Sequence, residues 1–172
     1  MDTNQISIDS QKPRPDWDKY FMEIAQMVAT RATCNRGTDL KYMPGFKGVG
    51  AVIARDRVIL STGYNGSPRG MEHCDQAGHE LVDGHCIRTV HSEGNAVAQA
   101  AKNGISIDGA TIYTTASPCY DCLKLLINAG IKKVVYSQYY DSRYDMSKHV
   151  LDLAQKAGVE TACVKAEETK NS

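Results

Sequence analysis

The chain has 172 residues, of which 42% are hydrophobic and 23% charged, as expected of a globular protein that buries a core. Lysine plus arginine and aspartate plus glutamate both total 20, so the formal net charge is +0, which argues against a nucleic-acid-binding protein. No apolar run reaches the roughly 20 residues that span a bilayer, and residues 1–5 lack the profile of a signal peptide, so we expect a cytoplasmic protein without a membrane segment.

The first half of the chain predicts a helix followed by a long loop and a hairpin. Residues 1–14 are polar and without period, and we expect a flexible lead-in. Apolar residues at three-and-four spacing predict a helix that begins near Trp17 and ends near Thr33. A glycine-rich loop of about fifteen residues follows, and the strand-like runs 49–54 and 58–62 flank a charged turn.

The second half alternates helices and strands. Residues 71–88 hold three of the five histidines without periodicity, and we expect an irregular loop there. Ser117 is a plausible N-cap for a helix that starts at Pro118. The remaining predicted elements are a helix from Thr89 to about 103, with His91 and Glu93 on its first turn, a strand at 111–115, the helix 118–129, a strand at 131–136, a helix at 146–157 and a strand at 159–164.

This order predicts an α/β fold in three α-β-α layers. A leading hairpin followed by alternating strands and helices gives a mixed five-stranded sheet with helices on both faces. We expect one domain over residues 15–165, with a lead-in at 1–14 and a frayed tail at 166–172.

Two short motifs carry the chemistry, His91-Ser92-Glu93 and Pro118-Cys119-Tyr120-Asp121-Cys122. Neutral imidazole and thiolate are zinc ligands, and a catalytic zinc keeps three protein ligands and one position for water. His91, Cys119 and Cys122 supply three ligands, and Glu93 is placed to act as a catalytic proton shuttle. H-x-E followed by P-C-x-x-C is the signature of zinc nucleobase deaminases.

Each half of this pattern has a plainer explanation by itself. A C-x-x-C pair also serves as a redox couple or as half of a structural zinc site, and His91 alone could be a core or surface imidazole. The two motifs in this order, each followed by a helical pattern, favour the catalytic interpretation.

Several further segments resemble the deoxycytidylate (dCMP) deaminase family of the cytidine and deoxycytidylate deaminase superfamily, over roughly residues 17–165. These segments are Ala32-Thr33-Cys34, Gly48-Val49-Gly50-Ala51-Val52-Ile53, Ser61-Thr62-Gly63-Tyr64-Asn65-Gly66-Ser67-Pro68 and His91-Ser92-Glu93-Gly94-Asn95-Ala96. The resemblance implies a cytidine deaminase-like fold and zinc-dependent hydrolysis of dCMP to dUMP and ammonia, which supplies dUMP for thymidylate synthesis.

The resemblance also implies substrate-binding residues. Asn65 matches a residue that contacts the sugar or base, and Tyr140 matches a tyrosine near the nucleotide. Alternatively, Asn65 only supports a turn and Tyr140 is an exposed aromatic side chain. A 5'-phosphate needs cations, for which Arg69 is the first candidate, and each candidate alone is also explained as a surface charge. The other candidates are Arg36, Lys47 and Arg88.

A structural zinc is a further implication of the resemblance. Cys34 and Cys74 match its ligands, and we favour His79 and Cys86 as the other two. His85 and His73 are possible substitutes, and the plain alternative is free thiols with surface histidines. An ion there would stabilise a long loop that has few apolar residues.

The family implies regulation and assembly as well. Many members are activated by dCTP with Mg²⁺, inhibited by dTTP and assembled as a homohexamer built from dimers. Two other functions stay open: deamination of another nucleotide such as dCTP or a purine, or a non-catalytic zinc-stabilised module that binds nucleotides or RNA. The intact Glu93 argues against the module, which needs no carboxylate beside an open zinc position.

Overall fold

A mixed sheet of five strands forms the centre of the fold, in the order β4-β3-β7-β8-β9. The computed structural model describes residues 14–39, 47–140 and 147–164. β3 is antiparallel to both β4 and β7, whereas β7, β8 and β9 are mutually parallel, which confirms the predicted sheet. The strands are β3 (Gly50–Arg55), β4 (Val58–Tyr64), β7 (Thr111–Ala116), β8 (Lys133–Gln138) and β9 (Glu160–Cys163).

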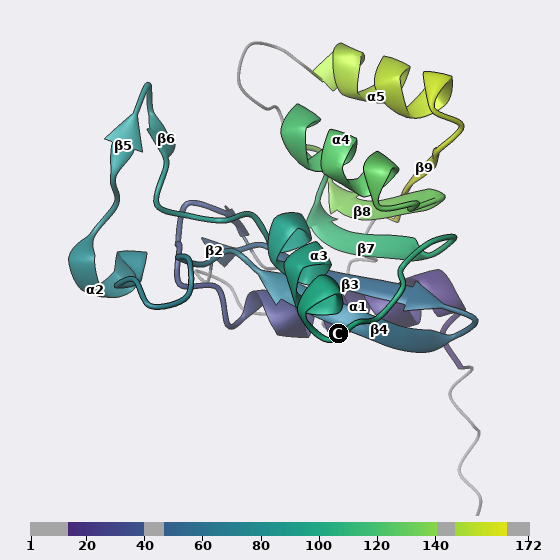
Figure 1. The fold of residues 1–172 in the computed structure, drawn as a ribbon, viewed down its shortest axis with the longest axis horizontal. Helices are drawn as coiled ribbons and strands as arrows, with labels where there is room; N and C mark the ends of the chain where they lie inside the picture. Colours follow the sequence, from purple (N-terminus) through teal and green to yellow (C-terminus); the bar gives the residue numbers. More distant parts are fainter. Residues whose placement is uncertain (1–13, 40–46, 141–146, 165–172) are drawn as a thin grey trace, which may run out of the picture.

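Helices cover both faces of this sheet (Figure 1), as the sequence predicts. The helix α1 (Trp17–Ala29) packs its Phe21, Met22 and Ala25 on one face. The opposite face buries a larger apolar cluster under the other three long helices. These helices are α3 (Ser92–Lys102), α4 (Tyr120–Asn128) and α5 (Ser147–Lys156).

A close approach of backbones seats α3 on β4. A Cβ atom on Gly63 would fall against the carbonyl oxygen of Ser92 and the backbone nitrogen of Ala96. Ser61 in the same strand donates from Oγ to the Ala96 carbonyl at 2.9 Å. The first turn of α3 is thereby held directly against the sheet, in the stretch of sequence that carries His91 and Glu93.

The starts of two helices differ from the predictions. α3 begins at Ser92, not Thr89, because the N–H and C=O groups of Val90 both bond to Gly66 and keep the preceding backbone extended. α4 begins at Tyr120, and its N-cap is Cys119, so the prediction of Ser117 as N-cap is wrong. The Ser117 hydroxyl instead accepts the Tyr140 N–H at 2.8 Å.

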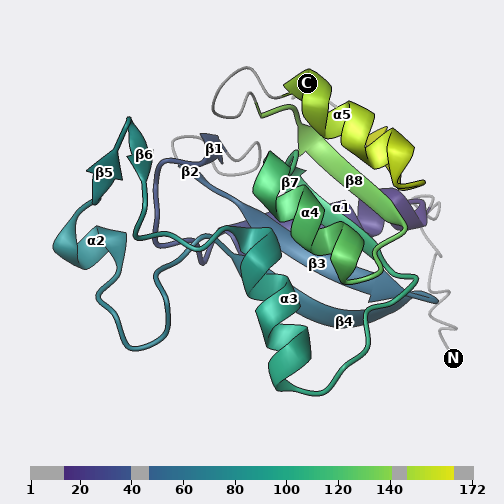
Figure 2. The ribbon, with the colours of Figure 1, turned by 45° about the horizontal axis from the view of Figure 1, so that its top comes forward.

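The predicted irregular loop at 71–88 contains short regular elements. They are the helix α2 (Cys74–Ala77) and the strands β5 (Leu81–Val82) and β6 (His85–Cys86), which pair as a hairpin. Figures 1 and 2 show α2 and this hairpin standing out from one side of the sheet. In the earlier loop, β1 (Thr38–Asp39) pairs with β2 (Lys47–Gly48).

Some of the sequence predictions fall wholly or partly outside the described residues. These include the lead-in up to residue 13, residues 40–46 of the glycine-rich loop, the start of the last helix at Met146 and the tail at 166–172. Among the helices that the structure describes, none is both long and apolar enough to cross a bilayer.

Candidate active site and metal centres

The ends of two helices bring the first predicted metal ligands together. His91 is the N-cap of α3, Cys119 is the N-cap of α4, and Cys122 lies on the first turn of α4. His91 Nδ1 lies 3.5 Å from the sulfur of Cys119 and 3.5 Å from that of Cys122. The three ligand atoms all lie within 4.8 Å of one another. One imidazole and two sulfurs match the donor set that zinc prefers.

The two sulfurs differ in how readily they ionise. The hydrogen bond with Cys122, aided by His91, lowers the pKa of the Cys119 thiol to about 4. The same hydrogen bond, together with burial, raises the pKa of Cys122. The lowered pKa favours the thiolate form of Cys119, whose sulfur also accepts the Cys122 N–H at 3.5 Å. The amino end of a helix favours such a negative charge.

Glu93 lies beside this group but is not one of its ligand atoms. Its side chain is 3% exposed, and burial raises the pKa of its carboxyl group. The hydroxyl of Ser92, itself fully buried, donates to Glu93 Oε2 at 2.8 Å. A carboxyl group that is buried, oriented and near a metal site has the properties of a general acid and base.

The cavity in front of these residues has a volume of about 720 Å³. Of the predicted substrate-binding residues, Asn65 and Tyr140 line it, whereas Arg69 is exposed and does not. Of the four candidate cations, only Arg36 lines the cavity. The lining residues are Cys34, Arg36, Gly37, Val49, Asn65, Gly84, His85, Cys86, Thr89, His91, Glu93, Ala116, Ser117, Cys119, Tyr120, Asp121 and Tyr140.

Asn65 is held in place from several sides. Its Oδ1 accepts the backbone N–H of Ser92 at 2.8 Å, and its backbone bonds to Val49 and Thr33. With Oδ1 engaged, Nδ2 is the side-chain group with donors to offer a ligand. Asn65 therefore both supports the local backbone and lines the cavity.

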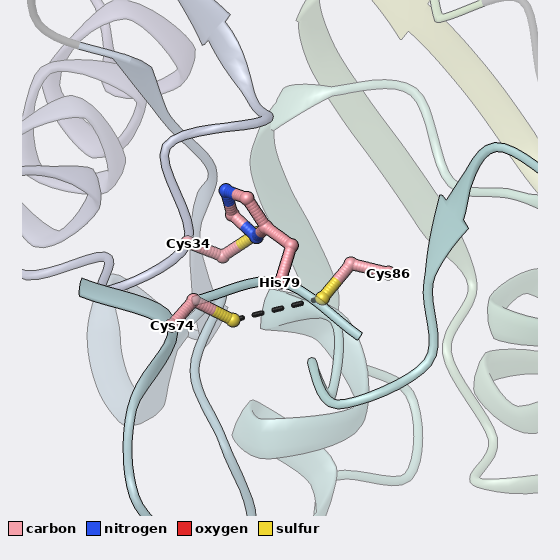
Figure 3. A group of neighbouring side chains, drawn as sticks. All are labelled: Cys34, Cys74, His79 and Cys86. Atoms are coloured by element: carbon pink, nitrogen blue, oxygen red, sulfur yellow. Dashed lines mark hydrogen bonds between the residues drawn. The ribbon is translucent and has the colours of Figure 1, made fainter. Parts of the chain in front are cut away.

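A second group of ligand atoms lies at the edge of the same cavity. We call it the loop cluster: Cys34, Cys74, His79 and Cys86, whose ligand atoms all lie within 4.8 Å of one another. Figure 3 shows these side chains pointing toward one another, with the sulfurs of Cys74 and Cys86 3.6 Å apart. His79 Nδ1 lies 3.8 Å from the Cys34 sulfur. These are the four residues favoured from the sequence, and their role as ligands stays a prediction.

The environment of the loop cluster suits a structural zinc ion. His79 Nε2 lies 2.8 Å from Asn35 Oδ1, so Nε2 carries the proton and Nδ1 faces the sulfurs as an acceptor. Partners of this kind typically orient histidines that bind metal. Burial raises the pKa of Cys74. Burial acts likewise on Cys86, but hydrogen bonds, of which that from the Thr89 hydroxyl is the largest, outweigh it and lower that pKa to about 6.

The two alternative histidines lie elsewhere. His73 Nδ1 pairs with Thr33 Oγ1 at 3.0 Å, and His85 lines the cavity. Neither belongs to the group that could hold an ion.

Several lining residues with polar side chains were not among the cavity residues predicted from the sequence: His85, Thr89, Ser117, Tyr120 and Asp121. Tyr120 and Asp121 lie between the two motif cysteines, so the motif itself could have indicated them as cavity residues. No sequence pattern indicated that His85 lines the cavity, because its position there depends on how the β5-β6 hairpin folds.

Comparison with known proteins places these residues in a family context. Residues 15–138 match the family model described as the cytidine and deoxycytidylate deaminase zinc-binding region. "ComE operon protein 2" of Bacillus subtilis is 40% identical over 155 residues, covering 90% of this chain and 75% of that protein. "Deoxycytidylate deaminase" of Schizosaccharomyces pombe is 34% identical over 158 residues, covering 86% of this chain and 44% of the yeast protein.

A solved structure matches over a similar extent. The crystal structure of dCMP deaminase from the cyanophage S-TIM5, in complex with dCMP and dUMP, is 33% identical. It superimposes with a TM-score of 0.68 and covers 89% of this chain and 100% of the phage chain. The expected fold is therefore confirmed.

Proposed function

Because the chain belongs to the cytidine and deoxycytidylate deaminase family, we propose that it hydrolyses dCMP to dUMP and ammonia. The observation that carries this proposal is the buried Glu93 beside the three-atom group of His91, Cys119 and Cys122, in one cavity. Relatives named deoxycytidylate deaminase and the phage enzyme that binds dCMP and dUMP support the choice of substrate.

Zinc held by His91, Cys119 and Cys122 would activate water for attack at the amino-bearing carbon of cytosine. The carboxylate of Glu93 accepts a proton from the attacking water. Glu93 delivers this proton to the ring nitrogen, then takes up the second proton of the water, now on the hydroxyl group bonded to carbon, and delivers it to the amino group, which leaves as ammonia while the C–N bond breaks and the C=O bond forms. Ser92 Oγ, 2.8 Å from Glu93 Oε2, holds the carboxylate in one orientation during this transfer.

The nucleotide is bound by residues that line the cavity. Asn65 donates through Nδ2 to the sugar or base, and Tyr140 packs beside the nucleotide. Arg36 and His85 bind the 5'-phosphate, and Arg36 replaces Arg69 in this role because Arg69 lies outside the cavity lining. The loop cluster holds a structural zinc.

Direct assay tests the reaction. Purified protein is mixed separately with dCMP, cytidine, dCTP and adenosine, and the loss of ultraviolet absorbance is followed. We expect dCMP to be deaminated with the highest kcat/KM. A higher kcat/KM for dCTP would reassign the substrate, and no turnover by zinc-loaded protein would favour a non-catalytic nucleotide-binding module.

Regulation, assembly and location form a second part of the proposal. Activation by dCTP with Mg²⁺, inhibition by dTTP, a homohexameric state, and a cytoplasmic role in supplying dUMP for thymidylate synthesis fit the family. Rate measurements at subsaturating dCMP, with and without each effector, test the regulation. Light scattering gives the assembled mass. Unchanged rates with both effectors would indicate an unregulated enzyme.

A further inference from the structure

The loop cluster is part of the wall of the nucleotide cavity. Two of its members, Cys34 and Cys86, line that cavity. The two residues assigned to the phosphate are their close neighbours in sequence, since Arg36 follows Cys34 by two positions and His85 directly precedes Cys86. Whatever fixes the cluster therefore also fixes the cavity groups Arg36 and His85.

Apolar packing does little to hold this wall. Leu81, Val82 and Ile87 are 51%, 46% and 53% exposed. Neither apolar cluster found among the described residues includes a side chain from residues 71–88. The segment also stands out from the side of the sheet (Figures 1 and 2). Its position depends on polar contacts and on the cluster.

The polar contacts run between two short stretches of chain. Arg36 donates to the Gly84 carbonyl at 2.7 Å, and Asn35 pairs with His79 at 2.8 Å. The same two stretches supply the cluster, because Cys34 meets sulfurs and an imidazole from residues 74–86. An ion bound to all four residues would join the stretches by bonds far stronger than these exposed hydrogen bonds.

We infer that an ion in the loop cluster and a nucleotide in the cavity bind cooperatively, because the ion fixes the wall that carries Arg36 and His85. This inference rests on the proposed function. The ion would set affinity for the nucleotide and not the proton transfer. Glu93 lies on the first turn of α3, which Gly63 and Ser61 seat on β4 through contacts that include no residue of the cluster.

Such coupling is reciprocal by thermodynamic necessity. If the ion increases affinity for the nucleotide, the nucleotide increases affinity for the ion by the same factor. The effect of the ion on nucleotide affinity can be measured with a variant that lacks the ion. The effect of the nucleotide on ion affinity can be measured with the natural protein.

The first test removes a ligand that does not touch the cavity. Cys74 belongs to the cluster but does not line the cavity, so Cys74→Ser changes no contact with a nucleotide. Cys163→Ser is the matched control, because Cys163 is exposed on β9 and outside the cluster. Zinc is counted by mass spectrometry, and the Kd of dUMP is measured by calorimetry.

We expect Cys74→Ser to lose about one zinc per chain and to bind dUMP about tenfold more weakly. The KM for dCMP should rise by a similar factor with little change in kcat. Cys163→Ser should match the natural protein in every measurement. Loss of the zinc with unchanged Kd for dUMP would overturn the inference, as would a natural protein that holds a single zinc.

The second test needs no variant and so does not depend on Cys74→Ser folding. Competition with a chelating dye measures the affinity of the loop cluster for zinc in the natural protein, with and without saturating dUMP. We expect this affinity to rise about tenfold with dUMP, and an unchanged affinity contradicts the coupling.

The outcomes separate this inference from the proposed function. A natural protein that neither deaminates dCMP nor binds dUMP disproves the function and the coupling with it. A natural protein that deaminates dCMP but shows unchanged dUMP affinity after loss of the cluster zinc disproves the coupling alone.

Discussion

The carboxyl group of Glu93 is buried and has little access to water. Burial raises the pKa of this carboxyl group, and the Ser92 hydroxyl, which donates to Oε2, fixes the direction of the oxygens. A proton carrier works best when its pKa lies near the working pH, so burial helps the residue to accept and return protons.

Replacement of this carboxylate should separate binding from chemistry. We expect Glu93→Gln to lower kcat by about 10²- to 10⁴-fold, because the amide keeps the shape but cannot carry a proton. The zinc content and the Kd of dUMP should stay close to those of the natural protein, because Glu93 is outside the ligand group. Absorbance assays and metal analysis check this, and near-normal turnover would remove Glu93 from the mechanism.

Asn65 has a structural role that is measurable apart from any ligand. Asn65→Ala leaves the buried N–H of Ser92 without its acceptor. We expect the free energy of unfolding to fall by about 1–3 kcal/mol and the KM for dCMP to rise. Gln99→Ala, at an exposed position of α3, is the control and should change neither quantity. Equal stability of the two variants in urea titrations would contradict the role assigned to Asn65.

At the scale of elements, the contact between α3 and β4 positions the catalytic residues. Gly63→Ala would place a methyl group against the backbone of Ser92 and Ala96, which cannot give way as a flexible side chain would. We expect a loss of about 1–3 kcal/mol in stability and a lower kcat, because the helix carrying Glu93 must shift.

Gly94→Ala is the matched control for stability, since it adds the same methyl group on α3. The new Cβ would lie 3.4 Å from Val90 Cγ1, an ordinary contact, and alanine has the better helix propensity. Thermal unfolding should show Gly63→Ala destabilised and Gly94→Ala equal to or above the natural protein. The reverse order would show that the close approach does not constrain α3.

A polar group at the start of α1 attaches this helix to the sheet. Asp18 accepts from the Tyr113 hydroxyl at 2.9 Å and from Lys133 Nζ at 2.8 Å. The hydrogen bond to Asp18 raises the pKa of Lys133. Burial, followed by the hydrogen bond to Asp18, raises the pKa of Tyr113.

Both shifts predict a loss of stability at high pH. Each folded-state pKa lies above its unfolded value of about 10, so the contribution is present below that pH and is lost as pH rises toward the folded pKa. Urea titrations from pH 8 to 11 should show this decline, and Asp18→Asn should flatten it. Glu23→Gln, an exposed position on the same helix, should leave it unchanged. An identical slope in Asp18→Asn would contradict the assignment.

At the scale of the molecule, the structure joins a sheet with two apolar clusters to a projecting segment that depends on polar contacts. Removing metal should therefore affect the two parts differently. We expect a chelator to increase amide hydrogen exchange in residues 71–88 while β3 and β7 stay protected. Mass-spectrometric exchange measures this, and a uniform increase over all peptides would show that the cluster stabilises the whole fold instead.

The sequence by itself determined the mixed sheet, the helices on its two faces and the two catalytic motifs. Helix and strand periods are local, so the helix Trp17–Ala29 and the strand Thr111–Ala116 could be predicted from neighbouring residues, although the helix ends about one turn before the predicted end near Thr33. The position of His91 and Cys119 at the starts of two helices could also be predicted, because the helical patterns that follow the two motifs are local. That residues 15–165 act as one domain stays a prediction.

Only the tertiary structure decided which residues meet around the cavity. Arg36 lines it and Arg69 does not, although both lie in glycine-rich loops. His79, and not His73 or His85, faces Cys34 from a position far along the chain. Residues 71–88 have no period that orients their side chains, so their partners depend on long-range contacts that a local pattern does not encode.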